Sequence, residues 1–339
     1  MRLSLNIKVF FSALFFVILV STFYSSVSEA KPTTQVARTA AGGSVACTGN
    51  ANGIIEKTVP GDGCEVQPDT QKLTFFRLEL CTEEPTGPTT SAIVDRTKCF
   101  TFFRNDAGSE VSIKKLLGTQ IGLPRHYEAV PYGTYTHGLV TMGSTFKFKS
   151  SVTFDGDVAD TDSNDTGSTC VTKIPAGGAS TIIYGFHTSL NHANSNVDCT
   201  DGATAAEIII GVNTMTMDNS NNCYHLKKFV TSGPLIDAYL LQSDGTLHDN
   251  VNGSDVVPQS AASGCKSGVS NGVTNIQGVM PFTTPIEISP QTVGLQIEYN
   301  NTQGLKLDMA SDNVFYKFDS SFFDFTLKAQ TGRKKGAFR

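Results

Sequence analysis

Residues 146–154 read FKFKSSVTF, and this stretch decides the fold class. Apolar side chains occupy four of its five even-numbered positions, and every other position is lysine, serine or threonine; the apolar members are Phe146, Phe148, Val152 and Phe154. Successive side chains of a strand point to opposite faces of a sheet, so this period of two predicts a strand with one buried face.

The same alternation recurs near the end of the chain. Its apolar positions form three sets: Val293, Leu295, Ile297 and Tyr299; Leu305, Leu307 and Met309; and Val314, Tyr316 and Phe318. We expect three successive antiparallel strands there, joined by short turns such as residues 300–304. Other runs predict strands at 73–80, 99–104, 110–114, 134–142, 180–186, 206–217, 235–241, 273–282 and 322–327.

No window of a dozen residues keeps a helical stripe, so the pattern predicts an all-β protein. We expect one or two antiparallel β-sandwiches, stapled by disulfides, after a cleaved signal peptide. The expected divisions are a signal peptide (1–30), an N-terminal leader with Cys47 and Cys64 (31–71), a β-sandwich region (72–156), a polar linker or loop (157–178), a second β-rich region (179–330) and a basic tail (331–339).

The first thirty residues predict export. A short basic start with Arg2 and Lys8 precedes the apolar run 9–20, and small polar residues follow as far as Ala30. This order is typical of a secretory signal peptide that is cut before Lys31. The apolar run has about half of the ~20 residues that a membrane span needs, so an uncleaved anchor is the less favoured alternative. We expect a secreted, cell-surface or periplasmic protein with no membrane span in the mature chain.

The mature chain would carry 24 basic and 30 acidic residues, a net charge of −6. This balance offers no basic stripe for phosphate groups, so we expect no nucleic-acid partner.

Eight cysteines lie in the mature part, and an even number in an exported protein predicts disulfides. Their spacing argues against a zinc or redox site, because the sequence has no C-x-x-C. Pairing along the chain is one of 105 possible connectivities. It would join Cys47 with Cys64, Cys81 with Cys99, Cys170 with Cys199, and Cys223 with Cys265.

The stretch VPYGTYT at 130–136 resembles the entry into a strand in prealbumin-like β-sandwich domains. Proline and glycine suit a tight turn, after which Tyr135 would point into the sheet. Together with its surroundings, about residues 64–154, it resembles a set of uncharacterised exported bacterial β-sandwich proteins. The resemblance implies a secreted or cell-surface β-sandwich that serves as a scaffold or adhesion module, and it assigns no catalytic residue.

The acidic segment 155–167, DGDVADTDSNDTG, is a candidate calcium site. Carboxylate and amide oxygens are the ligands that calcium prefers; those available are Asp157, Asp160, Asp162, Asn164 and Asp165. The spacing copies the start of an EF-hand loop, but the sixth position is Asp165 rather than glycine and the twelfth is Val171 rather than glutamate. A solvated acidic loop is therefore the main alternative, and calcium is the one cofactor that we consider.

These features predict a structural or adhesive protein without catalytic activity, whose partners are surface polymers or other protein chains. The alternative is an extracellular or periplasmic module that binds carbohydrate or calcium.

Overall fold

A computed structural model describes residues 45–50, 52–57, 63–89, 91–114, 127–160, 166–184, 195–212, 222–223, 226–230, 235–248, 259–260, 272–309, 314–321 and 324–332. The described residues form strands and no helix, which confirms the predicted all-β class. Accordingly, no helix in these ranges is long and apolar enough to cross a membrane.

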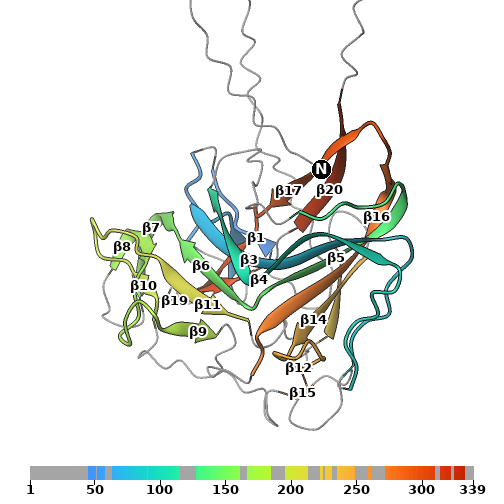
Figure 1. Cartoon of the computed structure of the whole chain (residues 1–339). Coiled ribbons are helices and arrows are strands. Elements are labelled where there is room, and N and C mark those ends of the chain that lie inside the picture. Colours follow the sequence, from blue (N-terminus) through green and yellow to red (C-terminus); the bar gives the residue numbers. More distant parts are fainter. Residues whose placement is uncertain are drawn as a thin grey trace, which may run out of the picture.

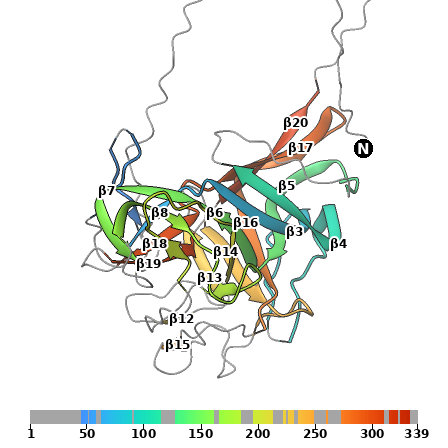
Figure 2. The ribbon, with the colours of Figure 1, turned by 90° about the vertical axis from the view of Figure 1, so that its left-hand side faces the viewer.

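Two large sheets carry most of the strands (Figures 1 and 2). The seven-stranded sheet has the order β1 (Val45–Ala46), β2 (Cys64–Val66), β18 (Leu305–Met309), β19 (Val314–Ser320), β7 (Ser151–Asp160), β8 (Thr166–Thr172) and β10 (Val197–Asp198). The nine-stranded sheet has the order β13 (Leu226–Val230), β14 (Leu235–Leu241), β16 (Asn275–Ile288), β5 (Gly133–Gly143), β3 (Thr70–Cys81), β6 (Thr145–Lys149), β11 (Ile208–Gly211) and β9 (Ile182–Tyr184), with β4 (Cys99–Lys114) paired to β3.

Two further pairs complete the described strands: β12 (Asn222–Cys223) with β15 (Gln259–Ser260), and β17 (Thr292–Asn300) with β20 (Asp324–Thr331). Most pairs are antiparallel, as expected. The exceptions are β1 with β2, β7 with β19 and β9 with β11, which are parallel.

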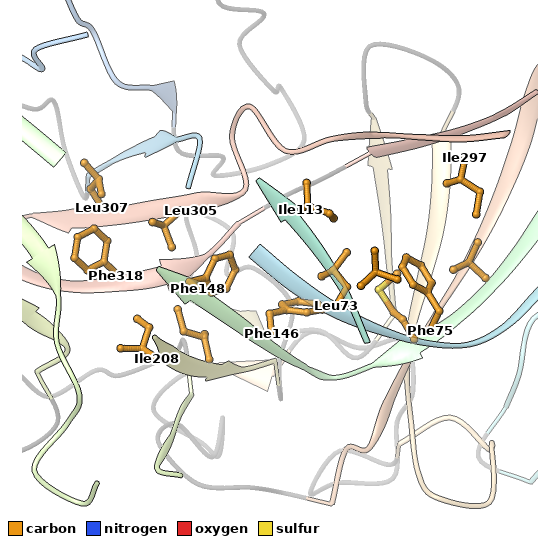
Figure 3. Close-up of a cluster of buried hydrophobic side chains, with 14 of the residues drawn as sticks. Leu73, Phe75, Ile113, Phe146, Phe148, Ile208, Ile297, Leu305, Leu307 and Phe318 are labelled. Atoms are coloured by element: carbon orange, nitrogen blue, oxygen red, sulfur yellow. The ribbon is translucent and has the colours of Figure 1, made fainter. Parts of the chain in front are cut away.

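The main core lies between the large sheets. Figure 3 shows Leu305, Leu307 and Phe318 of the seven-stranded sheet near Phe146 and Phe148 of the nine-stranded sheet. All five side chains are at least 98% buried. The alternation read in 146–154 therefore places its phenylalanines in the interior, as a half-buried strand requires.

The β17–β20 ribbon covers another part of the same core through Ile297 and Leu327. Residues 300–304 join β17 to β18, but these two strands do not pair with each other as we had expected: β17 pairs with β20, and β18 pairs with β19. Asn301 is buried in this connection and donates to Gln71 Oε1 at 3.3 Å. This hydrogen bond ties the connection between β17 and β18 to β3.

In β19, the predicted buried face was right for Phe318 and wrong for Val314 and Tyr316. Phe315 and Phe318 of β19 are buried, whereas Val314 and Tyr316 are only half-buried. The register of β18 with β19 shifts after Asp308, which changes the face that the following residues present.

The expected sequence divisions do not follow the sheets. In the leader 31–71, the described residues include β1, β2 and the start of β3. The expected linker 157–178 contains the end of β7 and the whole of β8, which pair as antiparallel neighbours. Strands from 72–156 and from 179–330 share both large sheets, since β5 pairs with β16 and β7 pairs with β19. Only residues 331–332 of the basic tail are described.

Candidate functional site

The acidic segment does not converge on one point in its described part. Asp157 is exposed, whereas Asp160 is 1% exposed and its Oδ2 accepts a hydrogen bond from the Cys199 amide at 3.4 Å. Asp162, Asn164 and Asp165 lie outside the described residues. Across the ranges that the structure describes, no three acidic, histidine or cysteine side chains are placed to hold a metal. The calcium site stays a prediction.

Three of the sequential cysteine pairs are disulfides: Cys47 with Cys64, Cys81 with Cys99, and Cys170 with Cys199. Cys265 lies outside the described residues, so its pairing with Cys223 also stays a prediction. Disulfides persist in oxidising compartments, and these three therefore fit the expected export.

Among the residues that the structure describes, the most exposed aromatic side chains lie along an edge of the nine-stranded sheet. Residues 127–132, here called the 127–132 strip, run beside the first part of β4. Phe103 and Tyr127 form an antiparallel bridge, and the Glu128 amide donates to the Phe102 carbonyl at 3.1 Å. The strip thus extends the sheet beyond β4.

Tyr135 holds the end of the strip in place. Its side chain is 1% exposed, and its hydroxyl donates to the Pro131 carbonyl at 2.8 Å. Burial raises the pKa of this hydroxyl, so it stays a neutral donor. The edge of the Phe100 ring meets the Tyr135 ring, with centroids 6.0 Å apart. The inward tyrosine is the one that the 130–136 motif predicted.

Three aromatic residues of this edge face solvent in part. Phe100 is 38% exposed, Tyr127 is 42% exposed and Tyr132 is 71% exposed. Tyr127 also packs edge-on against the buried ring of Phe103, with centroids 6.2 Å apart. We call Phe100, Tyr127 and Tyr132 the aromatic rim.

In the described part of the chain, the other large apolar residues that face solvent are aliphatic and come from other elements: Ile93, Ile174, Ile182 and Val293. The rim is therefore distinct in its chemistry as well as in its position.

A buried ion-pair cluster stiffens the sheet beside the rim. Glu79 of β3 is 1% exposed and accepts from Arg77 Nη2 at 3.0 Å and from Arg96 Nε at 2.9 Å. Thr101 of β4 also donates to Glu79 Oε1, at 3.3 Å. Burial lowers the pKa of Arg77, but the neighbouring Glu79 opposes this shift. The cluster ties β3 to β4 next to Phe100.

Further along β4, a bulge interrupts the edge. Ser109 pairs with Phe75 and Arg104 pairs with Arg77, so residues 105–108 protrude opposite a single residue of β3. Gly108 has a φ of 81°, and the Asn105 side chain donates to its carbonyl at 2.9 Å. Bulges are a common means of preventing edge-to-edge pairing. A second register shift lies between Leu78 and Glu79, where the pairing skips Phe102 of β4, so the edge beside the rim is also irregular.

Exposed charges next to the bulge neutralise each other. Arg104 binds Asp106 through two bonds, of 2.8 Å and 3.0 Å. The hydrogen bond from Arg104 holds the pKa of Asp106 below its usual range. The positive charge of Arg104 is therefore balanced by Asp106 rather than left for a ligand of the rim.

One stretch of the sequence has the residue spacing of a hydrolase motif. Residues 268–272 read GVSNG, which has the G-x-S-x-G spacing of a hydrolase nucleophile elbow. That motif requires a turn between a strand and a helix. The described residues contain no helix, and Ser270 itself lies outside them.

No family model matches the chain, and no curated protein or solved structure is detectably similar to it. The resemblance of 130–136 to prealbumin-like domains therefore stays a prediction.

Proposed function

We propose that the protein is an exported structural or adhesive protein that holds its partner without catalysing a reaction. The observation that carries this proposal is the aromatic rim on a sheet edge. Tyrosine and phenylalanine are enriched in binding surfaces, because each supplies a large contact area with few rotatable bonds.

The scaffold supports this role because it orders the rim before binding. Cys81 and Cys99 are directly opposite each other in β3 and β4, and the disulfide between them precedes Phe100 by one residue. Glu79 binds Thr101, the neighbour of Phe100 in β4, and Tyr135 binds Pro131, the neighbour of Tyr132. A preordered surface loses little conformational entropy on binding, which favours affinity without a large interface.

Two assays of the secreted protein, expressed in an oxidising host, test the proposal. Electron microscopy with size analysis should reveal ordered filaments or arrays if the role is structural. Adhesion of protein-coated beads to surfaces of the producing cells should reveal retention if the role is adhesive. A monodisperse monomer whose beads are not retained would overturn the proposal.

An esterase assay tests the absence of catalysis. We expect no turnover of p-nitrophenyl acetate above a heat-denatured control. Turnover that is lost in a Ser270→Ala variant would contradict the non-catalytic role and would assign chemistry to the 268–272 segment.

A further inference from the structure

The size of the aromatic rim limits what it can hold. A fully exposed aromatic residue offers ~200 Å², so the observed fractions leave about 300 Å² of exposed surface on the three residues together. A stable protein interface buries about 800 Å² on each partner. The rim alone is too small for such a partner, whereas its area suits a narrow ligand that crosses a few side chains.

We propose that the aromatic rim binds a neutral carbohydrate chain. This inference rests on the proposed adhesive function and names the chemistry of its partner. A π face carries negative electrostatic potential, and the C–H groups of a sugar ring are weakly positive, so the two surfaces attract each other. Tyr127 and Tyr132 each add a hydroxyl that can exchange hydrogen bonds with sugar hydroxyls.

The spread of the rim along the strip suits a polymer more than a single sugar. Phe100 lies on β4, and its ring meets Tyr135, whose hydroxyl binds Pro131 beside Tyr132. Tyr127 lies at the other end of the strip against Phe103. Rings at both ends of the strip can contact successive units of one extended chain.

Charge argues for a neutral polymer. The nearest guanidinium groups are already engaged: Arg77 and Arg96 bind Glu79, and Arg104 binds Asp106. An acidic polysaccharide would compete with these carboxylates for the arginines and would be repelled by the exposed Glu128 of the strip, whose charge also acts on Arg77 and Arg104. A basic polysaccharide would compete with the arginines for the carboxylates of the ion pairs. Neutral hydroxyl groups require neither exchange.

The test uses the secreted, disulfide-bonded protein with insoluble cellulose and chitin in a pull-down assay. Soluble mannan, xylan and alginate serve as ligands in affinity electrophoresis. We expect retention by at least one neutral polymer and none by the acidic alginate. The Tyr127→Ala, Tyr132→Ala double variant should bind at least about tenfold more weakly.

Three controls keep the outcome clear. Tyr132→Phe keeps the ring and should bind within about threefold of the wild type. Ile93→Ala removes a 54% exposed side chain outside the rim and should leave binding unchanged. Thermal melting of each variant separates lost binding from lost folding.

Binding by the double variant at wild-type strength would overturn the inference, as would failure of the wild type to bind any neutral polymer. Periodate oxidation of the cell surface separates this failure from failure of the proposed function. If coated beads still adhere after oxidation, the protein is adhesive but its partner is not carbohydrate. If beads never adhere and no assembly forms, the proposed function itself is wrong.

Discussion

Gly63 offers a sharp test of whether the N-terminal segment is part of the sandwich. Gly63 is buried, has a φ of 111°, and directly precedes Cys64 of β2. A Cβ at this position would overlap the carbonyl oxygen of Leu307 in β18. A Gly63→Ala substitution must therefore move the backbone of one of two paired strands, because no side-chain rotation relieves the overlap.

Two costs add at this position. An unfavourable φ destabilises by about 1–3 kcal/mol, and overpacking a buried site costs about 1–3 kcal/mol more. We expect Gly63→Ala to lower the free energy of unfolding by about 4 kcal/mol. Gly53→Ala is the matched control, because Gly53 has a φ of 77° but nothing within 4 Å of its added Cβ. The control should cost about 1 kcal/mol.

Chemical denaturation of both variants, followed by intrinsic tyrosine fluorescence, measures the difference. Non-reducing conditions keep the Cys47–Cys64 disulfide in both proteins. If the two free energies of unfolding agree within about 1 kcal/mol, then Gly63 does not pack against Leu307. The description of β2 as an integral strand beside β18 would then be wrong.

Three further predictions concern charge. Glu79→Gln should destabilise by about 2–3 kcal/mol because it leaves two partly buried arginines without a carboxylate, whereas Glu298→Gln at an exposed pair should cost less than about 0.5 kcal/mol; equal denaturation midpoints would contradict the role of the cluster. Millimolar calcium should raise the melting temperature if the segment 155–167 binds the ion, and an unchanged melting temperature would remove that site. Burial would raise the pKa of Asp198, but hydrogen bonds from Thr200 and the charge of Lys173 lower it overall. Its stabilising effect is therefore present above the ordinary aspartate pKa of about 3.9 and is lost as the pH falls through the lowered value. In acid titrations, Asp198→Asn should weaken this loss, and an unchanged profile would contradict it.

Local patterns predicted many of the strands, although not β8 in the expected linker, and they did not predict most of the strand partners. The alternation in 146–154 and in Leu305 and Leu307 identifies buried faces, because the side-chain period of a strand depends only on neighbouring residues. The pairing of β5 with β16 joins residues far apart in the sequence, and no local pattern specifies it. A bulge also changes which side chains are buried, and local alternation does not reveal it. Simple alternation selects Tyr316 for the core, but the register shift between β18 and β19 places Phe315 there instead.

Of the residues at the candidate site, the sequence predicted the placement of Tyr135 alone, which supports the aromatic rim from below its surface. Tyr135 was expected to point inward from its position after a Pro-x-Gly turn, and it does. Phe100 and Tyr132 carry no comparable signal, since an aromatic residue in a β protein is more often in the core. Their exposure follows from their place at an edge of the sheet, and that place depends on long-range pairing.

Tyrosine labelling on the producing cell tests the central claim most directly. Mild nitration followed by mass spectrometry compares the purified protein with the protein attached to its native surface. We predict that Tyr132 reacts readily in the purified protein and is protected on the surface, while buried Tyr135 stays unreactive in both. Equal labelling of Tyr132 in the two states would contradict the claim that the aromatic rim holds the partner.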